Sequence, residues 1–71
     1  MTFGPHINLV NRIVQYISEK IITAELKPGE RIVEGRMARE LNVSTIPLRE
    51  AFRLLEKDGL IERMPRRGVR V

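Results

Sequence analysis

Cysteine and tryptophan are absent from this chain of 71 residues, and histidine occurs only once. Without cysteine, the chain can form neither a disulfide nor a thiolate-ligated metal site. The single histidine, His6, lies near the N-terminus, and a histidine-based metal site or nucleophile would need partners that the sequence lacks. We therefore expect no catalytic residue, no metal and no cofactor, and an enzyme is the least favoured class of function.

Long apolar runs are missing as well. The longest one is too short to cross a bilayer, and no signal peptide is visible. We therefore expect a cytoplasmic protein without a membrane partner. The length allows one small domain with a modest core, so residues 1–71 are expected to fold as a single unit.

Positive charge is present and unevenly placed. The chain has 13 basic and 9 acidic residues, which give a formal net charge of +4. Residues 60–71 carry most of it, because four arginines lie there and Glu62 is the acidic residue among them. Concentrated arginine is typical of a surface that binds a polyanion. A solubilising tail is the alternative, but these arginines alternate with apolar residues and do not form one block.

Apolar residues recur at helical spacing in three segments. Pro28 and Gly29 mark a turn after the first segment, and a short strand can follow at 31–33. Beyond the third segment the period changes from helical to alternating, which is typical of strands. The sequence thus predicts helices at about 8–24, 34–41 and 45–58, then a hairpin in 60–71 with its turn at 65–68.

The stretch "NVSTIPLRE" between the second and third helices is suited to turning the chain sharply. Asn42 tolerates the left-handed conformation that ends many helices. Ser44 stands at the N-cap position of the next helix, and Val43 has the spacing of a hydrophobic staple with Leu48. Pro47 costs little in a first turn, where N–H groups have no intrahelical partner. Two helices with so short a connection are predicted to form a helix-turn-helix.

Glycines bound the last part of the chain. Gly59 is expected to close the third helix, and Gly68 can adopt the positive φ that the hairpin turn needs. A two-stranded hairpin is marginal alone and must pack against the helices. The predicted fold class is therefore mainly α with a small β-hairpin, a winged helix-turn-helix with three helices and a two-stranded wing.

The start of the third helix has the chemistry of a surface that reads DNA. A helix N-terminus carries partial positive charge, and the hydroxyls of Ser44 and Thr45 lie there. Arg49 and Arg53 lie off the inner face, where arginines reach guanine edges or phosphates in a major groove. Ile46 also points outward, either towards a thymine methyl or as an isolated exposed apolar residue.

The hairpin arginines Arg66 and Arg67 would then reach the neighbouring backbone or the minor groove. Each residue alone also has a purely structural interpretation, since Ser44 can serve only as a cap, and Arg49 and Arg53 can pair with nearby glutamates. Only the combination of turn, basic helix and basic hairpin favours double-stranded DNA.

Two other classes of function are possible for such a fold. A winged helix that binds a protein predicts an apolar outer face on the third helix, whereas Glu50, Arg53 and Lys57 occupy it here. An RNA-binding module favours aromatic stacking platforms. The aromatic residues of this chain number only three, namely Phe3, Tyr16 and Phe52.

Four motifs, "PGERI", "VSTIPLREA", "LLEKDGLI" and "RRGVRV", lie within residues 26–71. Together they resemble the N-terminal domain of GntR-type bacterial transcription regulators, although any one alone would be weak. The segments "PLREAF" and "RGVRV" most resemble the sequences of the branch whose C-terminal domain is all-helical. Family members are dimeric repressors or activators, and their C-terminal domain binds a small metabolite.

The resemblance implies which residues touch DNA, and it implies a homodimer of the full-length protein on a palindromic operator. It also implies a small-molecule effector, bound by a C-terminal domain that this chain lacks. Thr45 departs from the arginine usual after the serine, and Gly35 and Arg36 share the place of a basic residue early in the second helix. Taken with the residues above, the expected DNA-binding set is Arg36, Ser44, Thr45, Ile46, Pro47, Arg49, Arg53, Arg66, Arg67 and Gly68.

Overall fold

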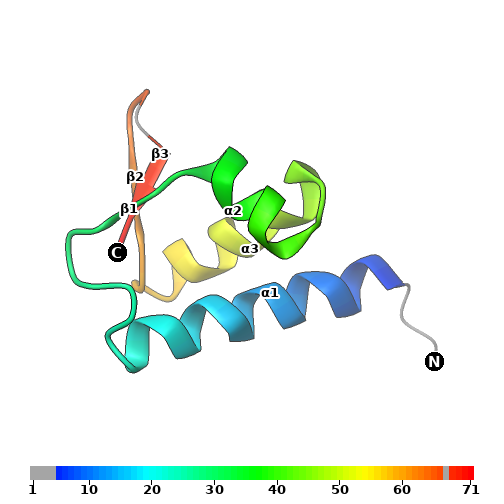
Figure 1. Ribbon diagram of the computed structural model, residues 1–71, viewed down its shortest axis with the longest axis horizontal. Coiled ribbons are helices and arrows are strands. Elements are labelled where there is room, and N and C mark those ends of the chain that lie inside the picture. The colour runs from blue at the N-terminus through cyan, green and yellow to red at the C-terminus, as the bar shows by residue number, and fades with distance from the viewer. Residues whose placement is uncertain (1–4, 67) are drawn as a thin grey trace.

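Three helices and a small sheet make up the residues that the structure describes, 5–66 and 68–71, in a computed structural model. Figure 1 shows the elements in their chain order. They are α1 (Pro5–Ile22), β1 (Arg31–Ile32), α2 (Glu34–Leu41), α3 (Thr45–Lys57), β2 (Glu62–Met64) and β3 (Gly68–Arg70). The predicted winged helix-turn-helix is confirmed.

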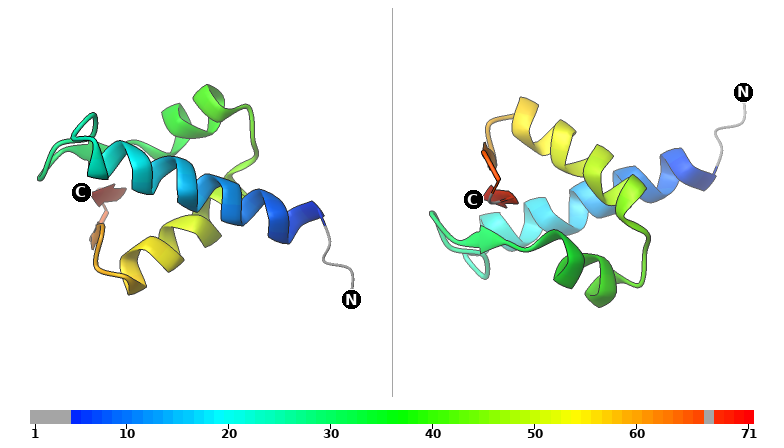
Figure 2. Two further views of the ribbon diagram at one scale, coloured as in Figure 1. Left: turned by 90° about the horizontal axis from the view of Figure 1, so that it is seen from below. Right: turned by 90° about the horizontal axis from the view of Figure 1, so that it is seen from above.

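The core lies where α1 crosses beneath the pair formed by α2 and α3 (Figure 2). α1 and α3 have the most extensive contact between helices, because the apolar stripe of each faces the other. Ile17, Leu48 and Leu55 have no exposed surface, and burial of such a side chain contributes about 1.5–3 kcal/mol. The other buried apolar residues are Val10, Ile13, Ile32, Met37, Ala38, Ala51, Phe52, Ile61 and Val69.

α1 is displaced from the predicted 8–24 and begins at Pro5. Proline is well tolerated in a first turn, so the helix can include it. The helix ends two residues early because Ala24 adopts φ 63°, which a helix cannot continue. The Thr23 hydroxyl donates to the carbonyl of Glu19 at 2.9 Å, and the backbone N–H of Leu26 reaches the carbonyl of Lys20 at 3.0 Å.

The junction between α2 and α3 has the predicted local geometry. Asn42 adopts φ 56°, and the N–H of Val43 donates to the carbonyl of Ala38 at 3.0 Å. This left-handed ending satisfies carbonyls that the helix leaves open. Ser44 is the N-cap residue of α3 with extended backbone angles, but its hydroxyl makes no hydrogen bond to the helix. The expected side-chain cap is therefore absent.

α3 matches its prediction except that it ends at Lys57, one residue early. Gly59 has φ 80°, and the N–H of Leu60 donates to the carbonyl of Leu55 at 3.0 Å. Positive φ at this position suits glycine because a side chain would crowd the backbone. The predicted inner face is also confirmed, since Leu48, Ala51, Phe52 and Leu55 are all buried.

The sheet is wider than the predicted two-stranded wing. β3 pairs antiparallel with β2 on one side and with β1 on the other, so the strand order is β1-β3-β2. Ile32 lies opposite Val69 in this register, and both side chains are buried. The two-residue strand before α2 therefore joins the wing to the core. Figure 1 shows this sheet at the end of the molecule where α3 ends.

Candidate nucleic-acid interface

The outer face of α3, which we define as Thr45, Ile46, Arg49, Arg53 and Lys57, lies opposite the buried face of that helix. Four of these residues are exposed and Thr45 is half-buried. Ile46 is 66% exposed, so its apolar side chain is available to a ligand on this face. With exposed Ser44 just before it, the start of this face offers hydroxyl, methyl and backbone N–H groups in one place.

Pro47 differs from the other predicted contact residues because it is buried. Because it is buried, its side chain offers little surface to a ligand. As the third residue of the helix, it occupies a position where a missing N–H leaves no intrahelical bond unmade. Its contribution is therefore to fix the first turn, from which its neighbours project.

Arg49 reaches across to α2 from the outer face of α3. Its Nε donates to Oε1 of Glu34 at 2.7 Å, while the side chain keeps 65% of its surface exposed. Arg49 thus has an ion-pair partner on another helix, which the sequence did not predict. Glu56 has Arg63 as its partner, with Nε 3.6 Å from Oε1.

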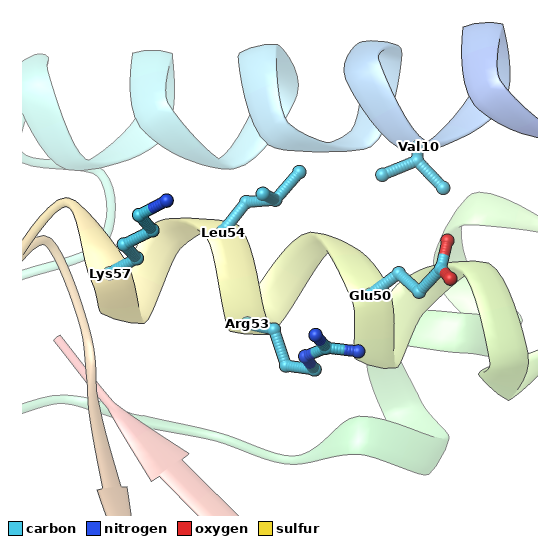
Figure 3. Close-up of a pocket in the computed structure, with 5 residues that line it drawn as sticks. All are labelled: Val10, Glu50, Arg53, Leu54 and Lys57. Carbon is cyan, nitrogen blue, oxygen red and sulfur yellow. The ribbon is translucent and has the colours of Figure 1, made fainter.

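Arg53 lies one turn beyond Arg49 and is exposed. Figure 3 shows its side chain projecting away from α1, whereas Val10 and Leu54 project into the space between α1 and α3. That space is an open hollow of about 340 Å³ between the two helices. Arg53 thus projects from the outer face of α3 at the edge of this hollow, which Glu50 and Lys57 also line.

Arg36 is exposed in the first turn of α2. It follows Glu34 by two positions, and the carboxylate of Glu34 is the group that reaches Arg49. The structure thus places the start of α2 beside the outer face of α3. Gly35, between them, has open space where a side chain would stand.

The wing carries the remaining predicted residues. Arg66 is exposed at the hairpin turn with φ 61°, and Gly68 has φ 84°. The carbonyl oxygen of Ile32 lies 3.5 Å from the place of a Cβ at Gly68, where β1 approaches β3. Arg67 lies outside the described residues. The prediction of positive φ at Gly68 is confirmed.

A hollow next to the wing joins it to the C-terminal end of α3. One of its residues, Arg63, was not among the DNA-binding residues expected from the sequence, although it is one of the four arginines of residues 60–71. The hollow is lined by Glu56, Arg63, Met64, Pro65, Arg66 and Gly68. The wing and the C-terminal end of α3 therefore border one hollow, with Arg63 and Arg66 on the wing side and Glu56 on the helix side.

Other kinds of site are not evident in the described part of the chain. Residues 5–66 and 68–71 include no group of three or more histidines or carboxylates placed to hold a metal ion. None of the described helices combines the length and the apolar character that spanning a membrane requires. The pKa of Lys20 is raised above its ordinary value, because its ammonium donates a hydrogen bond to the carboxylate of Glu25 at 2.8 Å and lies beside Tyr16.

Known proteins with similar sequences are regulators of transcription. The chain is 48% identical over 52 residues to the uncharacterized HTH-type transcriptional regulator YdhC of Bacillus subtilis (strain 168), covering 73% of this chain and 23% of that protein. An uncharacterized HTH-type transcriptional regulator of Mycobacterium tuberculosis (strain CDC 1551 / Oshkosh) is 33% identical over 58 residues, covering 82% and 24%. The chain thus spans about a quarter of the curated relatives it matches.

A solved structure shows the same fold. A chain from Rhodococcus sp. RHA1, assigned as a GntR transcriptional regulator, superimposes with a TM-score of 0.85 at 34% identity. The match covers 87% of this chain and 30% of that one. The model of the family described as "Bacterial regulatory proteins, gntR family" matches residues 9–71. With the helix-turn-helix and wing described above, the chain belongs to the GntR family of bacterial transcription regulators and is a DNA-binding domain of that family, not an enzyme.

Proposed function

We propose that the chain reads a specific sequence of double-stranded DNA, with α3 in the major groove and the wing on the adjacent backbone or minor groove. The observation that carries this proposal is the set of exposed basic side chains on the outer face of α3 and on the wing, which meets the C-terminal end of α3 at the Arg63–Glu56 ion pair. These side chains include arginines on both parts, and the outer face begins at a helix N-terminus, whose first N–H groups have no intrahelical partner. Major grooves admit a helix, and arginine suits both guanine and phosphate.

On the helix, the side chains divide by chemistry. Ser44 and Thr45 can exchange hydrogen bonds with phosphates or bases, and exposed Ile46 suits the methyl group of thymine. Arg49 and Arg53 supply the longer reach to guanine or phosphate. Pro47 contributes to binding only indirectly, by restricting the backbone of the first turn of α3, because its side chain is buried.

At the edges of the helix, the contacts are expected to be with phosphates. Arg36 at the start of α2 and Arg66 on the wing supply charge, and Gly68 adopts the positive φ with which the hairpin turn ends. Arg67 belongs to the same proposed contact, although it lies outside the described residues. Such contacts position a protein on DNA and make its affinity depend on salt.

The full-length protein is proposed to be a homodimeric repressor or activator in the bacterial cytoplasm, where the DNA lies. A two-fold dimer would match a palindromic operator, since each half-site would receive one copy of this domain. A metabolite effector would bind in the part of the relatives that this chain does not span. The full-length protein is proposed to belong to the branch of the family with an all-helical C-terminal domain, because the segments "PLREAF" and "RGVRV" resemble that branch.

Selection of bound duplexes from a random pool tests the proposal. We expect the domain to enrich a short motif, and Arg49→Ala to weaken binding to it by about 1–3 kcal/mol. Arg12→Ala removes the same charge from an exposed position of α1 and should leave that affinity nearly unchanged. Circular dichroism of each variant controls for folding. Enrichment of no sequence, or equal losses in both variants, would contradict the proposal.

A further inference from the structure

Glu34 and Arg49 lie fifteen positions apart in sequence and meet across the helix-turn-helix. Glu34 opens α2, and Arg49 projects from the outer face of α3. Nε of Arg49 lies 2.7 Å from Oε1 of Glu34, a short distance typical of a charge-assisted hydrogen bond. The two side chains remain 65% and 31% exposed. An ion pair with this much exposed surface contributes little to the free energy of folding, so a gain in stability does not explain why the two residues are paired.

The atoms used in this contact decide what Arg49 can still do. A guanidinium has five N–H donors in a rigid plane, one on Nε and four on the two terminal nitrogens. Because Glu34 accepts from Nε, the edge that combines Nε with a terminal nitrogen is occupied. The edge formed by the two terminal nitrogens stays available, and it can donate two parallel hydrogen bonds to O6 and N7 of guanine.

We propose that Glu34 is a positioning residue of the DNA-reading surface, which holds the guanidinium of Arg49 so that its terminal edge meets a guanine. The role rests on the proposed function of the surface. A long arginine side chain samples many rotamers, and a partner that selects one of them before binding lowers the cost of ordering it on DNA. Glu34 thereby sets the base preference at one position of the operator.

The charge of Glu34 makes this role measurable. A carboxylate beside the outer face of α3 repels phosphates, so its removal should strengthen binding to DNA of any sequence. Loss of the hydrogen bond that Arg49 donates to Glu34 should at the same time weaken the preference for guanine over other bases. If Glu34 had only a structural or only an electrostatic role, its replacement would change the affinities for all duplexes in the same direction.

The experiment uses the chain with a duplex selected from a random pool by the wild type, its single-base replacements at each guanine, and a duplex of unrelated sequence. We expect Glu34→Ala to bind the unrelated duplex at least as tightly as the wild type. Its preference for one guanine should fall about tenfold, the lower end of what a bidentate contact discriminates. Glu34→Gln should recover part of the preference, because its amide oxygen can still accept from Nε–H.

Glu40→Gln is the matched control. It removes the same charge from an exposed position near the other end of α2, so it should raise affinity for both duplexes without altering base preference. Circular dichroism shows whether each variant folds. A Glu34→Ala variant that is folded and keeps the wild-type base preference, or that loses affinity equally for every duplex, would overturn the positioning role.

Nuclear magnetic resonance of the free protein separates this role from the proposed function. The Nε–Hε signal of Arg49 should be shifted and slow to exchange in the wild type, and should move to the position of a solvated arginine in Glu34→Ala. Absence of this difference would overturn the positioning role even if the domain selects a sequence. If the signal behaves as expected but the wild type selects no sequence, the proposed function fails and this role falls with it.

Discussion

Glu62 and Arg70 face each other across the wing, in register on β2 and β3, and their side chains form an ion pair in which Nε of Arg70 donates to the carboxylate. The distances from Oε2 are 2.9 Å to Nε and 2.8 Å to Nη2. The one acidic residue of the last segment is thus committed to Arg70, and Arg63 is within 4 Å of Glu56. Among the described arginines of the wing, Arg66 is the one with no ion pair.

This pairing predicts unequal contributions of the wing arginines to DNA binding. Arg66→Asn should flatten the dependence of log K on log salt concentration by about 0.9, the value for one lost phosphate contact. Asparagine is the suitable replacement because it tolerates the φ of 61° at this position. Arg70→Gln should leave the slope nearly unchanged. Titrations of a random duplex over a range of salt provide both slopes, and a similar flattening in both variants would show that the Glu62–Arg70 pair opens on DNA.

Two glycines with open surroundings should respond in opposite ways to the same substitution. At Gly35, inside the first turn of α2, alanine meets nothing within 4 Å and should stabilise the domain by about 0.5–1 kcal/mol. At Gly59, alanine has equal room but must adopt φ 80°, which costs about 1–2 kcal/mol. Urea unfolding followed by circular dichroism measures both. Changes of the same sign would show that backbone conformation does not control these sites.

Two adjacent leucines of α3 should differ sharply when truncated. Leu55 is completely buried, and Leu55→Ala should cost about 2–5 kcal/mol through lost burial and the cavity left behind. Such a loss is comparable to the whole stability of a domain this small, about 4–10 kcal/mol. Leu54 is 42% exposed, so Leu54→Ala should cost less than about 1 kcal/mol. Thermal unfolding of both variants tests this contrast, and similar melting temperatures would refute it.

The chain alone is expected to be monomeric in dilute solution. A standard interface buries about 800 Å² on each partner and has an apolar centre. In the described residues, the exposed large apolar side chains come from separate places in the chain, namely Ile22, Val33, Ile46 and Leu54. Analytical ultracentrifugation gives the mass directly. A stable dimer would mean that the contacts of the proposed homodimer lie within these residues.

Local sequence signals predicted the helix-turn-helix closely. The bounds of α2 match, and the left-handed Asn42 and the positive φ values at Gly59 and Gly68 were expected from residue type and position. Each of these features depends on interactions within a few residues. A cap, a turn or an amphipathic period acts over one or two helical turns, so it can be recognised without knowing what packs against it.

Distant pairings could not be predicted in this way. Nothing periodic marks a strand of two residues, so the pairing of β1 with β3 was missed. The Ser44 hydroxyl occupies the position of a cap without forming the bond, and the side chain of Pro47 is buried and not on the surface. The pairing of β1 with β3 and the burial of Pro47 both depend on how distant parts of the chain pack, which local patterns do not reveal.

The sequence by itself determined the class of fold, the placement of the basic residues and the family, because these depend on local pattern and on motifs of adjacent residues. Only the tertiary structure decided which charges meet. Arg49 finds Glu34 because α2 and α3 pack at their turn, and Arg70 finds Glu62 because β2 and β3 pair in one register. An ion pair needs its two groups within about 4 Å, and only the packing of whole elements sets such a distance between residues far apart in the chain.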